Sequence, residues 1–153
     1  MYKEVDGDLI KLALEGEFDV IAHGCNCFCT MGAGIAVKMA ATFYCNKYKL
    51  ERPEYKGDIN KLGNIDKATL IVNVKNGEIL KESFTKLIDP YKQYITIVNA
   101  YTQYFYGQNS PNCNQALDYE ALTLCLRKIN HLFKGKHIGL PQIGCGLAGG
   151  DWN

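Results

Sequence analysis

The sequence predicts one α/β domain in which helices cover a central sheet that is largely parallel or mixed. Apolar, β-branched runs of strand length alternate along the chain with segments of helical periodicity, a pattern typical of folds that layer helices on a sheet. Two of the strands, at 18–22 and 136–143, run into glycine-rich loops. The 153 residues are the usual length of one domain, so we expect a single domain over residues 1–153.

The first half of the chain contains the first glycine loop. We expect an edge strand at 2–5, a short helical or irregular segment at 9–14 and a strand at 18–22. A helix is predicted at 35–43, because Ala36, Met39, Ala40 and Phe43 share one face. Residues 49–62 are rich in charge and contain Pro53 and Gly57, so they are interpreted as a surface connection.

The second half leads to the second glycine loop. Strands are predicted at 63–74, 94–101 and 136–143, the middle one apolar enough to be covered on both faces. The polar segment 75–91 is interpreted as a loop. A helix is predicted over about 115–134, ending before Gly135. Its apolar stripe consists of Leu122, Cys125, Leu126, Ile129, Leu132 and Phe133.

Composition excludes several classes of protein. The net charge is +1 and the only arginines are Arg52 and Arg127, so we expect no nucleic-acid partner. No apolar run is long enough to cross a membrane, and the N-terminus lacks the apolar centre of a signal peptide, so a cytoplasmic location without membrane association is expected. The seven cysteines are an odd number and favour reduced thiols over a disulfide framework.

Both glycine loops predict phosphate binding. A helix N-terminus presents unpaired N–H groups, and glycine lets a phosphate approach the backbone. The first loop offers Met31, Gly32, Ala33, Gly34 and Ile35. The second offers Gly144, Cys145, Gly146, Leu147, Ala148, Gly149 and Gly150, and its glycines have G-x-G-x-x-G spacing. The alternative is a pair of glycine-rich turns between packed elements. Because ligands in such folds lie beyond the carboxyl ends of strands, both loops should meet at one edge of the sheet.

Four side chains beside these loops are candidates for chemistry or recognition. His23 could transfer a proton and Asp151 could orient a water, although a strand-end imidazole and a helix N-cap are the structural alternatives. Asn26 could read a sugar hydroxyl, because its amide both donates and accepts. Tyr106 ends an aromatic run after the strand at 94–101, where a ring could stack on a base or pack internally.

Metal and cysteine chemistry are not favoured. His23, Cys25, Cys27 and Cys29 alternate, but zinc sites prefer C-x₂₋₄-C spacing and a second ligand pair, which the scattered remaining cysteines do not supply. Most cysteines are therefore expected to be small buried hydrophobes. A cysteine phosphatase would need an arginine soon after its nucleophile, and neither arginine is so placed. We expect no metal and no cofactor.

Four motifs carry a resemblance to a known family. They are Gly7-Asp8-Leu9, His23-Gly24-Cys25-Asn26-Cys27, residues 31–36 (MGAGIA) and residues 140–152 (LPQIGCGLAGGDW). In these the chain resembles the macro domain family, and within it the yeast-type ADP-ribose-1″-phosphate phosphatases and their phage and bacterial relatives. The resemblance implies a three-layer α/β/α fold with a mixed sheet, and a chain that stops before the helix and strand that normally follow the tryptophan.

The resemblance also implies roles for residues. Asp8 would accept from the adenine amino group with the backbone of Leu9 beside it, and Asn26 would touch the distal ribose. The two glycine loops would bracket the diphosphate and the distal ribose, and His23 matches a histidine proposed for catalysis. The branch that removes ADP-ribose from protein carboxylates uses a lysine and an aspartate at positions that are Gln103 and Ala148 here, so covalent lysine chemistry is not expected.

The function expected is therefore that of a phosphatase. It would hold ADP-ribose-1″-phosphate between the loops and transfer the phosphoryl group to water, chiefly by positioning and charge stabilisation. Two alternatives stay open: a module that binds ADP-ribose without turnover, and a hydrolase of ADP-ribosyl or O-acetyl-ADP-ribose bonds. In each case the partner is a small nucleotide ligand.

Overall fold

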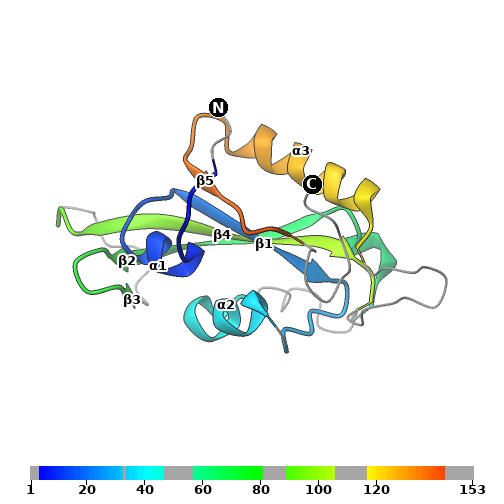
Figure 1. Ribbon diagram of the computed structural model, residues 1–153, viewed down its shortest axis with the longest axis horizontal. Coiled ribbons are helices and arrows are strands. Elements are labelled where there is room, and N and C mark those ends of the chain that lie inside the picture. The colour runs from blue at the N-terminus through cyan, green and yellow to red at the C-terminus, as the bar shows by residue number, and fades with distance from the viewer. Residues whose placement is uncertain (1–3, 33, 47–56, 81–88, 106–116, 144–153) are drawn as a thin grey trace.

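The computed structural model describes residues 4–32, 34–46, 57–80, 89–105 and 117–143. Five strands form one sheet in the order β3-β2-β4-β1-β5, and Figure 1 shows the helices arranged on its two sides. The elements, in chain order, are α1 (Leu9–Leu14), β1 (Val20–Asn26), α2 (Ile35–Phe43), the 3₁₀ helix η3 (Ile59–Lys61), β2 (Ile65–Asn73), β3 (Glu78–Leu80), β4 (Lys92–Gln103), α3 (Tyr119–Leu132) and β5 (Ile138–Gly139).

The sheet is mixed, as predicted. β1 pairs in parallel with both β4 and β5, whereas β2 is antiparallel to both β4 and β3. The long central strand β4 is buried over most of its length, which agrees with the apolar character of 94–101. The carboxyl ends of β1 and β4 therefore lie together at one edge of the sheet.

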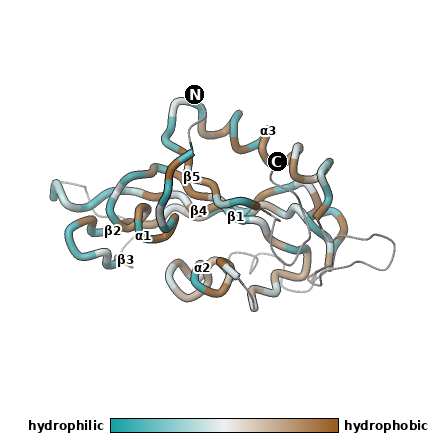
Figure 2. The backbone as a smooth tube through the Cα atoms, viewed as in Figure 1, coloured by the Kyte–Doolittle hydropathy of each residue, from teal (hydrophilic) through white to brown (hydrophobic). Residues whose placement is uncertain are grey.

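Helices cover both faces, so the described part of the chain has the expected α/β/α layers. α1 and α2 lie on one side of the sheet and α3 on the other (Figure 1). Successive strand residues point to opposite faces: Ile21 and Ile97 pack with α1 and α2, whereas Ala22 and Val98 pack with α3. Figure 2 shows the apolar side of α3 turned toward the sheet.

The helix predictions hold closely. α2 has the predicted bounds, and the segment at 9–14 is helical. α3 begins after Asp118, whose side chain accepts from the N–H of Ala121 at 3.0 Å. Its buried face is formed by Ala121, Cys125 and Ile129. Leu132, which we assigned to the apolar stripe, is 53% exposed.

The strand predictions need several corrections. β1 continues beyond residue 22 to Asn26, because β4 pairs with it through Cys25 before the register shifts. β3 lies within the segment interpreted as a loop, since the turn after β2 brings it back against that strand. Glu4 and Val5 belong to no strand. β5 is only two residues long, and Pro141, which has no N–H to donate, follows it closely.

No helix in the described ranges is both long and apolar enough to cross a membrane.

Candidate functional site

The first glycine loop begins where β1 ends, at Asn26. The side chain of Asn26 is 6% exposed and is used inside the loop. Its Oδ1 accepts from the N–H groups of Phe28 (3.0 Å) and Thr30 (3.2 Å), and its Nδ2 donates to the carbonyl of Thr30 (2.9 Å). Nδ2 has two hydrogens, so the second one has no acceptor among the described residues. Asn26 thus fixes the shape of the loop, in addition to any contact that it makes with a ligand.

The first glycine loop ends at the start of α2. Gly34 is the residue before the helix, with φ 61° and ψ −146°, and it makes no side-chain capping bond. The first turn of a helix leaves backbone N–H groups without intrahelical partners, which makes those of α2 candidates for binding an anion. Gly32 and Gly34 are exposed, and Met31 and Ile35 are half-buried against the core. Ala33 lies outside the described residues.

His23 is inside the protein and not at the mouth of the loop. Its side chain is 0% exposed, and its Nε2 lies 2.7 Å from Oδ1 of Asn99. Because the Nδ2 of Asn99 donates to the carbonyl of Cys45 (2.9 Å), Oδ1 is the acceptor of this amide, and Nε2–H of His23 donates to it. The proton is therefore on Nε2, which leaves Nδ1 as the unprotonated nitrogen.

Burial also determines the charge of this imidazole. Desolvation lowers the pKa of His23 to about 4, although the bond to Asn99 opposes the shift. His23 is consequently neutral at physiological pH. A neutral, fully buried imidazole is poorly suited to protonate a leaving group, which was the role expected from its position in the sequence.

Two thiols lie beside the imidazole of His23. The sulfur atoms of Cys25 and Cys45 each lie 3.5 Å from Nε2. Burial raises the pKa of the Cys25 thiol, and it raises that of Cys45 to about 12, so both stay protonated. Within the described residues no group of His, Cys, Asp and Glu side chains is suited to hold a metal ion.

The described cysteines are packing residues, as predicted for most of the seven. They are buried free thiols at Cys25, Cys27, Cys29, Cys45 and Cys125.

Asp8 is the N-cap of α1 and not the end of a strand. Its Oδ1 accepts from the N–H groups of Ile10 (3.0 Å) and Lys11 (3.2 Å), and within the described part of the chain Oδ2 accepts no hydrogen bond. Leu9 is the first residue of the helix and is half-buried against the core. Asp8 is exposed and lies on a cleft.

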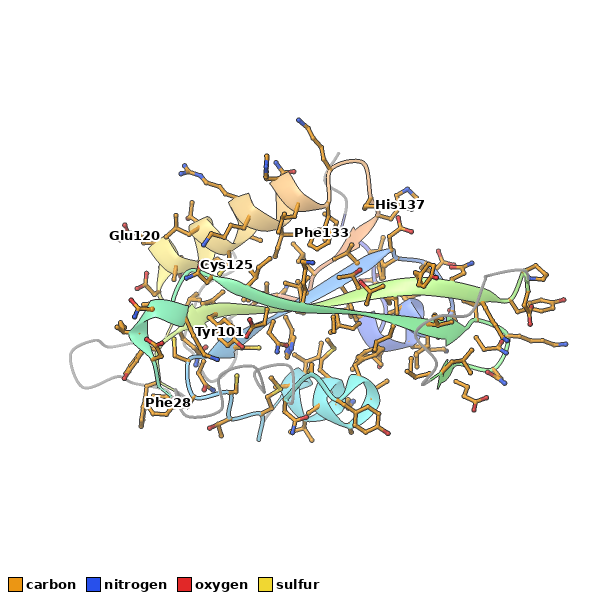
Figure 3. All side chains as sticks on the ribbon, turned by 180° about the vertical axis from the view of Figure 1, so that it is seen from behind. Phe28, Tyr101, Glu120, Cys125, Phe133 and His137 are labelled. Carbon is orange, nitrogen blue, oxygen red and sulfur yellow. The ribbon has the colours of Figure 1, made fainter. Side chains whose placement is uncertain are left out.

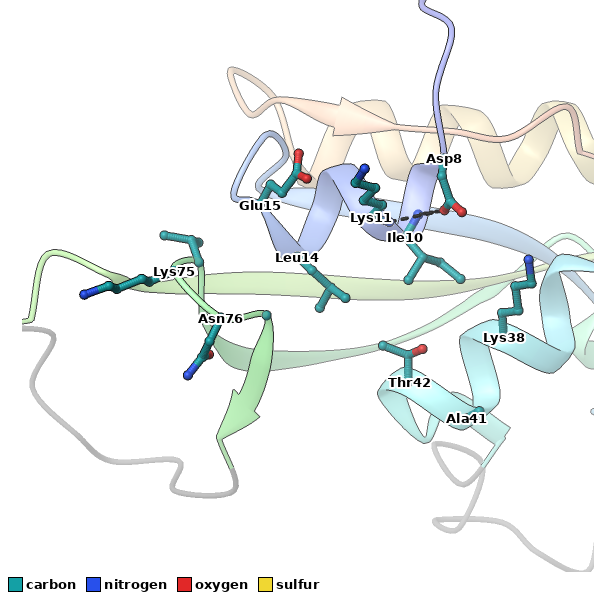
Figure 4. Close-up of a pocket in the computed structure, with 12 residues that line it drawn as sticks. Asp8, Ile10, Lys11, Leu14, Glu15, Lys38, Ala41, Thr42, Lys75 and Asn76 are labelled. Atoms are coloured by element: carbon teal, nitrogen blue, oxygen red, sulfur yellow. Dashed lines mark hydrogen bonds between the residues drawn. The ribbon is translucent and has the colours of Figure 1, made fainter.

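This cleft has a volume of about 530 Å³ and lies between α1, α2 and the turn that joins β2 to β3. Figure 4 shows Asp8 at the α1 end, with Lys38 rising toward it from α2. The lining is completed by Ile10, Lys11, Leu14, Glu15, Ala41, Thr42, Val74, Lys75, Asn76 and Gly77.

The aromatic run after β4 is mostly used for packing. Tyr104 and Phe105 meet the ring of Phe28 edge to face, with centroids 5.3 and 5.8 Å away. Tyr101 is buried beneath the loop, and its hydroxyl donates to Asp66 at 2.5 Å; Figure 3 shows Tyr101 and Phe28 at the same end of the sheet. The side chain of Gln103 donates to the carbonyl of Phe105 at 2.9 Å.

The second half of the predicted site belongs to residues that the structure does not describe. Tyr106 and the loop from Gly144 to Asp151, including Ala148, lie outside the described residues. Ile143, the last described residue before that loop, packs beside Gly24 of β1, where an added Cβ would lie only 2.7 Å from its side chain. The last described residue of the chain therefore lies next to β1.

Sequence reasoning missed Asn99 and Thr102. Both are polar, fully buried residues of β4, and the hydroxyl of Thr102 has no hydrogen-bond partner among the described residues. The signal for Asn99 was present in the sequence, because an amide within an apolar strand requires a buried partner.

Known structures share this fold. The chain matches the DarTG protein of Thermosipho africanus, solved in complex with ADP-ribose, with a TM-score of 0.60 and 17% identity over 95% of this chain and 34% of that one. It matches the macrodomain of Mycobacterium tuberculosis DarG with a TM-score of 0.54 and 20% identity, covering 99% and 82% of the two chains. The protein therefore has the macrodomain fold, which confirms the predicted resemblance at the level of the fold.

A sequence comparison identifies a phage relative. No family model matches the sequence. An uncharacterized 17.5 kDa protein of the tk-vs intergenic region of Enterobacteria phage T4 is 30% identical over an alignment 159 residues long, gaps included. The alignment covers 99% of this chain and 83% of the phage protein. The chain belongs to the same family as this phage protein.

Proposed function

We propose that this protein binds ADP-ribose at the carboxyl ends of β1 and β4 and hydrolyses ADP-ribose-1″-phosphate. One observation carries the binding proposal: the loop fixed by Asn26 ends at Gly34, the N-cap of α2, which has no side chain to bond the N–H groups of the first helical turn. Unpaired N–H groups at a helix start are a binding site for a diphosphate. The likeness to a structure solved with ADP-ribose supports the same ligand.

The remaining contacts are proposed from the resemblance. Asp8, with its unused Oδ2 and the adjoining backbone of Leu9, reads the adenine, while Asn26 contacts the distal ribose with its remaining amide hydrogen. Residues 31–35 and 144–150 bracket the diphosphate and the distal ribose, and Tyr106 covers the ligand. Asp151 orients the attacking water.

His23 has a different part in this proposal from the one expected. Its burial and its lowered pKa argue for a positioning residue that holds β1 and β4 together beneath the loop. Proton transfer is then left to Asp151 and to water.

Two measurements on the full chain test the proposal. Calorimetry with ADP-ribose tests binding, and phosphate release from ADP-ribose-1″-phosphate tests catalysis. Replacing Asp151→Asn should lower the rate of release by about a hundredfold and leave ADP-ribose binding nearly unchanged. An absence of ADP-ribose binding would overturn the whole proposal.

The burial of His23 also supports a second candidate, a module that binds ADP-ribose without turnover, because it removes the best general acid from the described part of the site. Tight binding of ADP-ribose by the unaltered protein without phosphate release would establish this candidate and refute the phosphatase.

A further inference from the structure

The cleft between α1, α2 and the β2–β3 turn is larger than the recognition of a base requires. Its volume of about 530 Å³ is within the range of about 300–1,000 Å³ that is typical of pockets for whole small ligands. Asp8, the proposed adenine contact, lies at one end only, and the cleft continues along α1 to the turn at residues 74–77. A ligand that places its adenine at Asp8 therefore has room for a further group on the adenosine side.

The charges in the cleft indicate what that group is. Lys11 and Lys38 are exposed, and within the described ranges neither ammonium has an ion-pair partner. Lys75 also lines the cleft, but its Nζ lies over the ring of Tyr91 at 5.1 Å and extends away from the other lining residues in Figure 4. Two available amines thus flank the end of the cleft at which Asp8 lies.

The acidic residues limit the size of the anion. Glu15 lies at the far end of α1, and Asp8 itself keeps one carboxylate oxygen unused. A long polyanion along the cleft would meet both carboxylates, whereas a single phosphate between Lys11 and Lys38 would have the carboxylate of Asp8 beside it but not that of Glu15, which lies on the other side of Lys11 (Figure 4). The floor between these groups is apolar, formed by Ile10, Leu14 and Val74, and suits the base and the carbon face of a ribose.

We propose that the cleft selects an ADP-ribose unit that carries an additional phosphate on its adenosine ribose, with Lys11 and Lys38 binding that phosphate. This inference rests on the proposed function, because it takes the position of the adenine from Asp8. It adds a specificity that depends on the adenosine half of the ligand, away from the proposed reaction at the distal ribose.

Calorimetry with ADP-ribose and 2′-phospho-ADP-ribose tests the inference on the full chain at low salt. The second ligand should bind about tenfold more tightly, because two exposed amines attract the added charge, and the preference should shrink in 0.5 M salt. The double variant Lys11→Gln/Lys38→Gln should lose the preference and keep its affinity for ADP-ribose. Lys75→Gln is the control: it removes the same charge from a lysine whose Nζ lies over the ring of Tyr91, and it should keep the preference.

The failures of the two proposals are distinguishable. If neither ligand binds, the proposed function is wrong. If ADP-ribose binds and the added phosphate gives no advantage, or if the advantage persists in the double variant, the selection by Lys11 and Lys38 is refuted while ADP-ribose binding stands. A single-stranded oligoadenylate that competes more strongly than 2′-phospho-ADP-ribose would also refute it, in favour of a nucleic-acid ligand.

Discussion

Nε2 of His23 donates a 2.7 Å hydrogen bond to Oδ1 of Asn99, and the two residues are register partners on the neighbouring parallel strands β1 and β4. Asn99 also makes a second hydrogen bond, in which its Nδ2 donates to the carbonyl of Cys45 just after α2. Both side chains are fully buried. This chain of bonds joins the two central strands to the segment that follows the helix of the glycine loop.

Replacing Asn99→Ala should therefore destabilise the protein strongly. The change leaves Nε2–H of His23 and the carbonyl of Cys45 unpaired in the core, and each buried orphan costs about 1–3 kcal/mol. We expect the free energy of unfolding, measured in urea, to fall by about 3 kcal/mol. Asn76→Ala is the matched control, because the bond of Asn76 to the N–H of Glu78 is exposed. Equal losses in the two variants would contradict the role of Asn99.

The pKa of His23 predicts a loss of stability in mild acid. The unfolded chain takes up a proton at His23 near pH 6.5, whereas the folded chain resists protonation until about pH 4. The stabilisation is complete above pH 6.5 and is lost as the pH falls toward 4, by about 3 kcal/mol over the whole interval. Urea unfolding at a series of pH values should show this slope, and His23→Gln should flatten it. An unchanged slope in the variant would show that His23 does not cause it.

Gly34 and Gly32 provide a matched pair within one loop. An added Cβ would meet no described residue within 4 Å at either position, but Gly34 has a positive φ and Gly32 does not. Backbone strain alone should make Gly34→Ala cost about 1–3 kcal/mol, and the displaced start of α2 should weaken ADP-ribose binding. Gly32→Ala should be nearly neutral for stability. Thermal unfolding and calorimetry check both variants, and a harmless Gly34→Ala would argue against a strained helix start.

Cys45 and Cys27 should resist alkylation in the native protein. Burial raises the pKa of each thiol to about 12, so little reactive thiolate exists at pH 8. Labelling with iodoacetamide should be about a thousandfold slower than for a free cysteine, and unfolding in urea should restore the normal rate. Peptide mapping identifies the residues, and fast native labelling of Cys45 would show that the core beside His23 opens readily.

Much of the fold follows from local sequence patterns. The α2 helix, the strands β2 and β4 and the covering helix α3 each have their own periodicity or β-branched composition, and the structure has them where the patterns predicted. β3 could not be predicted, because its three polar-flanked residues form a strand only through pairing with β2. The extension of β1 to Asn26 likewise depends on its pairing with β4.

By itself, the sequence determined that a strand, a glycine loop and a helix follow one another at residues 20–43, since composition and spacing act locally. Only the tertiary structure decided what the side chains do there. His23 was expected to face the ligand, but strand alternation turns it into the core, where loss of solvation keeps it neutral. Asn26, expected to read the ligand, fixes the loop. A histidine or an asparagine can contact a ligand or stabilise the fold, and its burial and hydrogen-bond partners decide which. Burial and partners depend on contacts between residues far apart in the chain.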